Sequence, residues 1–357
     1  MTPTSFLVLF FVYVLSCNTF IDNKQMVVNA DTECPIVSAP GDRRPNKNSL
    51  RLVQYNAEWL FIDYCSSAKC PGSGCSWATV TDAQTHMSYV ANAIKALNPD
   101  IVNICEVEGC DELNTLITSL KDTTYKPYLK QGTDTSTGQN VGMITRIDPL
   151  INLYRTEERA SYPITGSKCG YTGPAGTSGV SKHYITEFSL GGYKTALIGA
   201  HLLAIPTEPS RCAEREAQAQ VLQNVVAGYI AKGYEVILLG DMNDFDAEVP
   251  DVNSDKPTSY VLDIMKGLYG LKKGTYTLTN AASKMAQAER YSDWYDSDDN
   301  CATSSPKDYS MIDHVLMSSK IFGKVSTVSI YHGYTEYCGT MNSDHYPVVV
   351  DLTFYTF

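Results

Sequence analysis

Short apolar runs that stop at polar residues recur along this chain. In residues 236–239, Val, Ile, Leu and Leu follow one another without interruption, and Gly240 comes next. An unbroken apolar run of this length is typical of a strand buried on both faces. Asp241, Asn243 and Asp244 follow the glycine. The pattern predicts a buried strand that presents carboxylate and amide groups at its end, although Asp and Asn are also ordinary turn residues.

Similar patterns predict further strands and helices. Apolar runs and alternating positions predict strands at residues 49–55, 100–105, 141–144, 184–190, 194–199, 310–317, 325–331 and 348–352. Apolar positions three and four residues apart predict helices at residues 81–97, 111–120 and 208–230. Thr81 or Asp82 is expected to cap the first helix. Residues 169–181 and 296–308 are polar and are predicted to be loops. Strands that alternate with helices indicate a layered α/β architecture, which could be a sandwich or a doubly wound sheet.

The N-terminal residues are typical of a secretion signal. Residues 6–15 form an apolar run that is too short to cross a bilayer, and residues 28–30 place small side chains before Asp31. The alternatives are a signal anchor and, because of Cys17, a lipoprotein acylation site. We predict a secreted protein with a signal peptide at residues 1–30 and an N-terminal extension at residues 31–48.

The cysteine count agrees with secretion. Eleven cysteines become ten if Cys17 leaves with the signal peptide. An even number favours disulfides in an oxidising compartment. Cys65, Cys70 and Cys75 lie among Gly, Ser and Pro, which predicts a loop stapled by disulfides. A zinc site is the alternative, weakened because this stretch has no CxxC pair and no nearby His.

The overall composition is that of a globular protein, with 43% hydrophobic and 19% charged residues. The formal net charge is -11. A protein that binds nucleic acid simply by neutralising phosphates with Lys and Arg would be basic. The charge therefore argues against a passive nucleic-acid binder, but it allows an enzyme that meets phosphate through bound cations.

Polar residues of types that can bind metal or take part in catalysis recur at the ends of the predicted strands. One such residue alone is more often a cap or a surface group. Six strand ends carry one here, which is hard to ascribe to chance. The residues are Asn56, Glu106, His201, Asp241 with Asn243, Asp313, and Asp344 with His345.

The blocks around these residues carry a family resemblance. In order they are QYNAEWLF, ICEVEG, GAHLLAIP, LLGDMNDFD, SMIDHVLMS and SDHYPVVVDL, and the match covers residues 50–352. The set resembles the endonuclease/exonuclease/phosphatase superfamily, which includes deoxyribonuclease I, exonuclease III, neutral sphingomyelinases and inositol polyphosphate 5-phosphatases. The resemblance implies a four-layered α/β sandwich, with two β-sheets packed face to face between helices. It places a catalytic domain at residues 49–357, with one active site at the strand ends.

The resemblance also implies a metal site. Glu106 matches the family's principal divalent-metal ligand, Asn56 lies beside it, and Asp344 is a second acidic group on the metal side. The expected ion is Mg²⁺, with Ca²⁺ or Mn²⁺ as alternatives. A carboxylate-bound Mg²⁺ keeps several waters and bridges to phosphate oxygen, so a small protein anchor suffices.

The catalytic groups follow from the same resemblance. Asp241 and Asn243 match the pair that orients the attacking water and holds the scissile phosphate. His201 and His345 match the two catalytic histidines of deoxyribonuclease I-like members, and Asp313 matches the carboxylate that orients His345. These residue types suit hydrolysis of a phosphodiester, which needs an activated water, charge neutralisation and a proton for the leaving oxygen. An Asp–His pair fixes the imidazole tautomer and raises its basicity.

Some positions depart from the family pattern. Gln139 stands where deoxyribonuclease I has the carboxylate partner of its first histidine, so His201 is expected to face an amide. Lys182 stands where that enzyme has a phosphate-contacting Arg, which keeps the substrate-binding cation but loses the bidentate fork. Phe245-Asp246 and residues 311–314 replace blocks that are typical of 5-phosphatases, which argues against phosphoinositide headgroups.

We therefore expect a secreted, metal-dependent phosphodiesterase, most simply a deoxyribonuclease I-like endonuclease that hydrolyses DNA. The alternative substrate is a membrane lipid, as for a secreted sphingomyelinase. Such enzymes need an apolar loop to enter the interface, and the loops at residues 65–75 and 296–308 are polar. A catalytically silent surface-binding protein is a third hypothesis, which the intact residues in every block disfavour. No obligate protein partner is predicted.

Overall fold

The computed structural model of the chain describes residues 33–36, 39–62, 77, 79–296, 306–334 and 341–354. All of these residues belong to one structural unit, Asp31–Phe357. The predicted signal peptide, the predicted loop at residues 65–75 and most of the one at residues 296–308 lie outside the described residues.

Two β-sheets dominate the described part of the chain. The first is six-stranded, in the order β14–β15–β1–β2–β4–β3, and the second is five-stranded, in the order β10–β13–β9–β8–β7. The first sheet contains β1 (Ser49–Leu60), β2 (Ile101–Val107), β3 (Lys126–Leu129), β4 (Asn140–Thr145), β14 (Val325–Ile330) and β15 (Val348–Thr353). The second contains β7 (Lys182–Leu190), β8 (Tyr193–His201), β9 (Glu235–Asp241), β10 (Leu278–Asn280) and β13 (Asp313–Ser318). Two small sheets pair β5 (Ala160–Tyr162) with β6 (Gly176–Ser178), and β11 (Asp293–Trp294) with β12 (Tyr309–Ser310).

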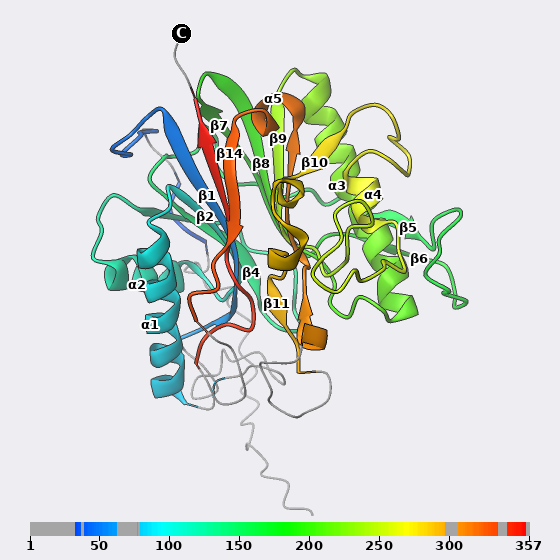
Figure 1. Ribbon diagram of the computed structural model, residues 1–357, viewed down its shortest axis with the longest axis horizontal. Helices are drawn as coiled ribbons and strands as arrows, with labels where there is room; N and C mark the ends of the chain where they lie inside the picture. The colour runs from blue at the N-terminus through cyan, green and yellow to red at the C-terminus, as the bar shows by residue number, and fades with distance from the viewer. Residues whose placement is uncertain are drawn as a thin grey trace, which may run out of the picture. The chain divides into compact units, whose positions relative to one another are not determined.

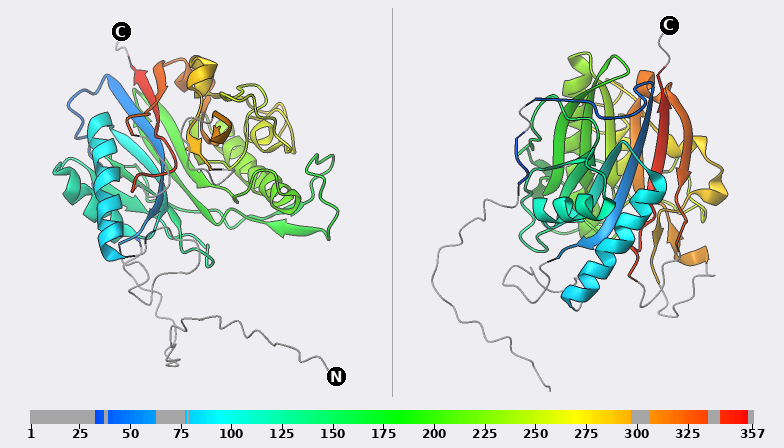
Figure 2. Two further views of the ribbon diagram at one scale, coloured as in Figure 1. Left: turned by 60° about the horizontal axis from the view of Figure 1, so that its bottom comes forward. Right: turned by 90° about the vertical axis from the view of Figure 1, so that its left-hand side faces the viewer.

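The helices lie outside the two large sheets (Figure 1, Figure 2). They are α1 (Val80–Leu97), α2 (Cys110–Leu120), α3 (Pro209–Ala231), α4 (Val261–Met265) and α5 (Ser319–Phe322), with 3-10 turns η1 (Ala281–Lys284), η2 (Gln287–Glu289) and η3 (Pro306–Asp308). Side chains of α1 and α2 form a core with the first sheet, and those of α3 and α4 form a core with the second.

Alternation of side chains along β1 decides which layer each residue enters. Leu50 and Leu52 belong to the core between the sheets, together with Ile237 and Leu239 of the second sheet. Val53 points the other way and packs with the residues of α1 and α2. The four-layered α/β sandwich implied by the family resemblance is therefore confirmed.

Each large sheet contains one parallel pair of strands. β1 and β2 are parallel and joined by α1, whereas β8 and β9 are parallel and joined by α3. The other strand pairings of these two sheets are antiparallel. A parallel pair needs a crossover connection and brings both carboxyl ends to the same edge. Asn56 and Glu106 lie toward these ends in the first sheet, and His201 and Asp241 in the second.

The predicted elements are present with shifted ends. The cap of α1 is Thr79, whose side chain accepts a hydrogen bond from the backbone N of Asp82 at 3.1 Å. The predicted caps, Thr81 and Asp82, lie inside the helix instead. The predicted strand at residues 310–317 is divided, because Ser310 pairs in β12 and β13 begins only at Asp313. The predicted loop at residues 169–181 contains β6.

Two disulfides cross-link the described residues. Cys34–Cys110 joins the N-terminal segment to α2, and Cys169–Cys212 joins a loop to α3. Cys105 is free and buried between the sheets. The predicted presence of disulfides is therefore confirmed, and Cys105 takes part in none. Cys65, Cys70 and Cys75 lie outside the described residues.

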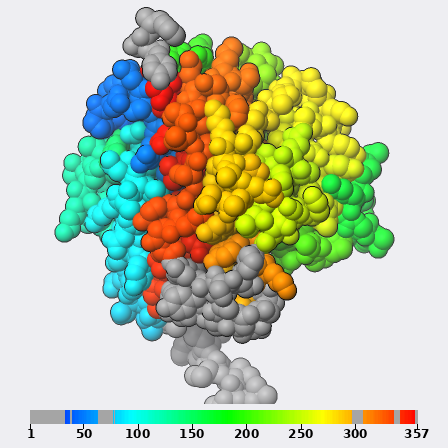
Figure 3. Space-filling view, in the orientation of Figure 1, coloured from blue at the N-terminus to red at the C-terminus, as the bar shows by residue number. Residues whose placement is uncertain are grey.

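Segments that are distant in sequence share one face of the molecule. In the space-filling view, the orange and red residues toward the C-terminus lie between the cyan residues of α1 and the yellow residues that follow α4 (Figure 3). β15 makes this arrangement possible because it pairs with both β14 and β1. Among the helices that the structure describes, none is long and apolar enough to cross a membrane.

Candidate active site

Polar side chains from both large sheets meet at one end of the sandwich. They are Asn56 of β1, Glu106 of β2, His201 of β8, Asp241 of β9, Asp313 of β13, and Asp344 and His345 before β15. Each of them has a hydrogen bond or an ion pair to another member of the group. The structure thus brings together the predicted strand-end residues, from segments up to 289 positions apart.

Asn56 lies at the centre of this group. Its Nδ2 atom is 3.2 Å from Oε1 of Glu106, 3.0 Å from Oδ2 of Asp241 and 3.4 Å from Nε2 of His345. Its Oδ1 atom accepts a hydrogen bond from the backbone N of Glu58 at 3.1 Å. One buried amide therefore connects residues of both sheets.

Glu106 reaches the site because of its backbone conformation. Regular alternation would point Glu106 in the same direction as Ile104, toward the helices. Its φ of 64° lies in the left-handed region, which is uncommon for a residue other than glycine. Oε2 of Glu106 accepts hydrogen bonds from the backbone N of Trp59 at 3.0 Å and from Nε2 of Gln139 at 2.7 Å. These two donors hold the carboxylate in the site.

Asp313 holds His345. Nδ1 of His345 donates to Oδ2 of Asp313 at 2.7 Å, and Oγ of Ser292 donates to the same oxygen at 2.9 Å. Burial by itself lowers the pKa of His345, but the negative charges of Asp313 and Asp344 outweigh it and hold this pKa well above its usual value. This shift favours the protonated imidazole, whose Nε2 atom faces the rest of the site.

The environment of His201 differs from the predicted one. Gln139 bonds to Glu106, and it is Nζ of Lys182 that lies 3.5 Å from Nε2 of His201. Oδ2 of Asp241 is also 3.5 Å from this ring nitrogen, so His201 does have a carboxylate neighbour. Burial and the charge of Lys182 hold the pKa of His201 well below its usual value. The expectation that His201 faces Gln139 is wrong, because Nζ of Lys182 lies between them. The lowered pKa favours the neutral imidazole.

Lys182 is fixed at the start of β7. Its Nζ atom lies 3.2 Å from Oε1 of Gln139 and 3.6 Å from Oδ2 of Asp134. The side chain is mostly buried. These contacts place a fixed positive charge beside His201.

Asp241 and Asn243 occupy the turn after β9. Oδ1 of Asp241 accepts a hydrogen bond from the backbone N of Asn243 at 2.9 Å, and Asn243 has a φ of 49°. Nδ2 of Asn243 donates to the carbonyl of Leu202 at 3.2 Å. Burial outweighs the charge of His345 and raises the pKa of Asp241 to about 7. Because the two groups interact, Asp241 and His345 titrate as a pair.

The acidic groups of the site suit a divalent cation. Carboxylate oxygens of Asp293 and Asp344 lie within 4.8 Å of each other and of a ring nitrogen of His345. Partial burial and the charges of Glu58, Asp293 and Glu106 raise the pKa of Asp344 well above its usual value. A bound cation relieves such repulsion between like charges, and carboxylate and amide oxygens are ligands that Mg²⁺, Ca²⁺ and Mn²⁺ accept. The donor set therefore fits a divalent metal.

Three neighbouring residues were not predicted. Glu58 accepts a hydrogen bond from the backbone N of Asp344 at 3.1 Å, and its place in the NAEW block was the signal for it. Gln54 lies on the same face of β1 as Leu52 and is buried. A polar residue that interrupts an apolar face is the sequence feature that could have indicated its role. Asp293 lies in a two-residue strand that has no recognisable sequence pattern.

Arg215 of α3, also missed, ties together the loops that follow β8 and β9. Its guanidinium is fully buried and donates to the carbonyls of residues 203–206. Its Nε atom lies 3.3 Å from Oδ2 of Asp244. Ile205 in the first loop has a φ of 69° and is 51% exposed. This conformation is strained for a β-branched residue.

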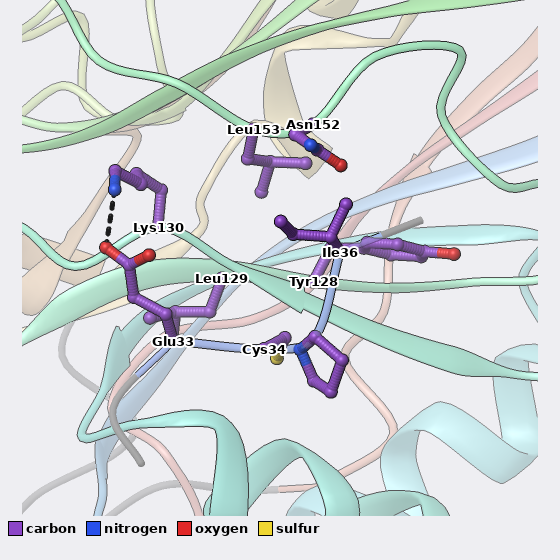
Figure 4. Close-up of a pocket in the computed structure, with 9 residues that line it drawn as sticks. Glu33, Cys34, Ile36, Tyr128, Leu129, Lys130, Asn152 and Leu153 are labelled. Carbon is purple, nitrogen blue, oxygen red and sulfur yellow. Dashed lines mark ion pairs between the residues drawn. The ribbon is translucent and has the colours of Figure 1, made fainter. Parts of the chain in front are cut away.

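A separate cavity of about 190 Å³ lies between β3 and the N-terminal segment (Figure 4). It is lined by Glu33, Cys34, Pro35, Ile36, Tyr128, Leu129, Lys130, Asn152 and Leu153. Nζ of Lys130 is 2.6 Å from Oε1 of Glu33 at its edge. None of the predicted site residues lines this cavity, so it is distinct from the strand-end site.

The sandwich fold and the acidic, histidine-containing site define a class, the metal-dependent hydrolases with a four-layered α/β sandwich that cleave phosphate esters. The profile of the Endonuclease/Exonuclease/phosphatase family matches residues 75–345. The chain belongs to this family and is a metal-dependent phosphodiester hydrolase.

Solved structures share the fold. The 3'-5' exonuclease (NExo) from Neisseria meningitidis has a TM-score of 0.55 and 13% identity, with 85% of this chain and 100% of that chain covered. An endonuclease/exonuclease/phosphatase family protein from Leptotrichia buccalis has a TM-score of 0.51 and 12% identity, with coverage of 85% and 100%. Truncated TDP2 from Caenorhabditis elegans has a TM-score of 0.49 and 17% identity, with coverage of 85% and 98%. None of the curated proteins compared with the chain matches it in sequence.

Proposed function

We propose that this chain is a secreted, Mg²⁺-dependent endonuclease of the deoxyribonuclease I-like kind that hydrolyses DNA. The observation that carries the proposal is the approach of two histidines to one carboxylate. Nε2 of His201 lies 3.5 Å, and Nε2 of His345 lies 3.9 Å, from Oδ2 of Asp241. A neutral and a protonated imidazole side by side offer a proton acceptor and a proton donor, and phosphodiester hydrolysis uses both.

The metal side of the proposed site comprises Glu106, Asn56 and Asp344, to which the structure adds Glu58. A divalent cation, when bound there, neutralises phosphate charge and makes water a better nucleophile. The protein's own contribution is to fix the ligands. Gln139 and a backbone N–H hold Glu106, and the backbone of Asp344 is bonded to Glu58.

On the other side of the proposed site, Asp241 and Asn243 orient the attacking water and the scissile phosphate. Asp313 directs Nε2 of His345 toward the phosphate, where the protonated ring donates a hydrogen bond or a proton. The Lys182 side chain provides a fixed positive charge that contacts a non-bridging oxygen of the scissile phosphate. Geometry and charge that are fixed before the substrate arrives are the main sources of rate in phosphoryl transfer.

The proposal includes the chain's organisation. Residues 1–30 act as a signal peptide, residues 31–48 form an extension and residues 49–357 form the catalytic domain. The disulfides Cys34–Cys110 and Cys169–Cys212 support an extracellular location, because disulfides persist in oxidising compartments.

Nicking of supercoiled plasmid by the purified protein tests the proposal. We expect nicking with Mg²⁺, Ca²⁺ or Mn²⁺, its loss in EDTA, and a strong decrease in Glu106→Gln. Glu33→Gln is the matched control, because Glu33 borders the separate cavity in Figure 4. Absence of nicking with all three metals would overturn DNA as the substrate.

One observation favours a lipid as the second candidate substrate. Tyr295 is 72% exposed and lies two residues after Asp293 in the sequence. Oδ1 of Asp293 lies 3.5 Å from Nε2 of His345. An exposed aromatic ring beside the site suits insertion into a lipid interface. Release of phosphocholine from sphingomyelin vesicles, with plasmid left intact, would favour this candidate. Tyr295→Ser should then reduce activity on vesicles but preserve activity on a water-soluble, short-chain analogue.

A further inference from the structure

We infer that Gln54 and Asn103 form a positioning relay that holds Asp313, and through it His345, from the opposite sheet. The inference rests on the proposed function, in which the Asp313–His345 pair serves the hydrolysis. It adds two residues to which the family resemblance assigns no role, although Gln54 is the first residue of the QYNAEWLF block.

Contacts between side chains define the relay. Nε2 of Gln54, on β1, donates to Oδ1 of Asp313, on β13, at 3.0 Å. Oε1 of Gln54 accepts a hydrogen bond from Nδ2 of Asn103, its register partner on β2. The other oxygen of Asp313 accepts from His345 at 2.7 Å. The chain of contacts therefore runs from β2 through β1 to the second sheet and ends at the imidazole.

Burial of these two amide side chains destabilises the folded state unless all of their polar atoms are hydrogen-bonded. Gln54 and Asn103 are both 0% exposed, and they lie on the inter-sheet faces that also carry Leu52 and Cys105. Oδ1 of Asn103 has no hydrogen-bond partner among the described residues. An unsatisfied buried polar atom destabilises the folded state, whereas apolar side chains of the same shape avoid this penalty. Stability alone therefore does not explain why amides occupy these positions.

Orientation of the carboxylate does explain them. Ser292 and His345 both bond to Oδ2 of Asp313, so Gln54 supplies the hydrogen bond to Oδ1. With both oxygens bonded, the carboxylate cannot turn, and the imidazole keeps Nε2 directed at the phosphate. Small errors in the placement of a reacting group lower rates strongly. Gln54 touches no substrate and acts as a positioning residue.

Gln54→Met tests the relay, because methionine keeps the length of the side chain and removes the hydrogen bonds of the amide to Asp313, Asn103 and the Sγ atom of Cys105. Gln223→Met is the matched control. Gln223 is also 0% exposed, and its Nε2 atom donates to the carbonyls of Ile264 and Tyr269. Both variants should lower Tm to a similar extent. Only Gln54→Met should lower kcat on plasmid, by about 10- to 100-fold with KM changed less than twofold.

A double-mutant cycle separates positioning from general damage. In an Asp313→Ala background, Gln54→Met should reduce kcat little further, because it acts through Asp313. Equal kcat losses in the Gln54 and Gln223 variants would overturn the relay. Losses of Gln54→Met and Asp313→Ala that multiply would overturn it as well.

A spectroscopic measurement keeps this test independent of activity. The proton on Nδ1 of His345 should give a downfield NMR signal that persists in Gln223→Met and broadens or shifts in Gln54→Met. If Gln54→Met does not fold, Gln54→Leu replaces it, since leucine also lacks the amide and carries no charge. A wild-type protein without activity would refute the proposed function, whereas an unchanged imidazole signal in the Gln54 variant would refute the relay.

Discussion

Nδ1 of His345 lies 2.7 Å from Oδ2 of Asp313, and this contact joins the loop before β15 to the first residue of β13. The carboxylate fixes which ring nitrogen points into the site, and its charge holds the pKa of His345 well above the usual value. The Asp313 carboxylate thus both orients the imidazole of His345 and favours its charged form.

Substitutions in this pair should behave as changes to one unit. His345→Ala should lower kcat by about 10²- to 10⁴-fold, the range for a general acid–base group. Asp313→Asn should lower it by a similar factor, because an amide holds the ring but does not stabilise its charge. The double variant should lose little more than either single one. Losses that multiply in steady-state assays on plasmid would place Asp313 elsewhere in the mechanism, at a metal for example.

If Glu106 is a metal ligand, Glu106→Gln should raise the Mg²⁺ concentration that the activity requires. The amide preserves the size of the side chain and still accepts from the backbone N of Trp59, so Tm should change little. Activity at limiting Mg²⁺ should fall strongly, and excess Mg²⁺ should restore part of it. A Mg²⁺ titration of the nicking rate measures this, and a half-saturating concentration equal to that of the wild type would remove Glu106 from the metal site.

Ile205→Gly should stabilise the protein. Ile205 has a φ of 69°, a conformation that costs an L-residue roughly 1–2 kcal/mol and glycine almost nothing. Half of the side chain is exposed, so little packing is lost. We expect the free energy of unfolding in urea to rise by about 1 kcal/mol. Leu150→Gly is the control, since Leu150 is 50% exposed and is not among the residues with positive φ. It should destabilise, and a loss of similar size at Ile205 would contradict the argument.

His183 should make the stability depend on pH. Burial and the charge of Arg155 lower its pKa from 6.5 to about 4, and Nε2 accepts a hydrogen bond from the backbone N of Thr156 at 3.0 Å. The unfolded chain takes up the proton first as the pH falls. The contribution of His183 is therefore complete above pH 6.5 and is lost between pH 6.5 and about 4. The slope should be about 1.4 kcal/mol per pH unit.

Urea unfolding between pH 7 and pH 4.5 measures this slope. His183→Gln provides a similar acceptor without a proton to gain, so its stability should vary less with pH in this window. Parallel curves for the variant and the wild type would show that His183 is not responsible.

The elements of the fold were largely predictable because buried strands and helices have recognisable local patterns of apolar residues. The apolar run at residues 236–239 became the centre of β9, and the spacing in residues 81–97 became α1. The order of the strands was not present in these patterns. It depends on pairings such as β1 with β15, whose partners are separated by about 300 residues, as Arg51 and Asp351 are. The family resemblance supplied the four-layered sandwich, and the structure supplied the strand order.

The site was predictable where chemistry restricts the residue type. Asn56, Glu106, Asp241 and His345 were found through the family blocks, and their side chains do converge. Contacts set by backbone conformation and loop packing were not predictable. Gln139 turned toward Glu106 and left Lys182 beside His201, and Asp293 reached His345 from a two-residue strand.

The pairing of β15 with β1 has a consequence for biosynthesis. Ser49 pairs with Thr353, and Asp344 and His345 lie on the segment that leads into β15. A nascent chain that still lacks residues 341–353 therefore has neither the strand that flanks β1 nor the second histidine. The site of a hydrolase built in this way is therefore completed only after β15 and the segment before it have been synthesised.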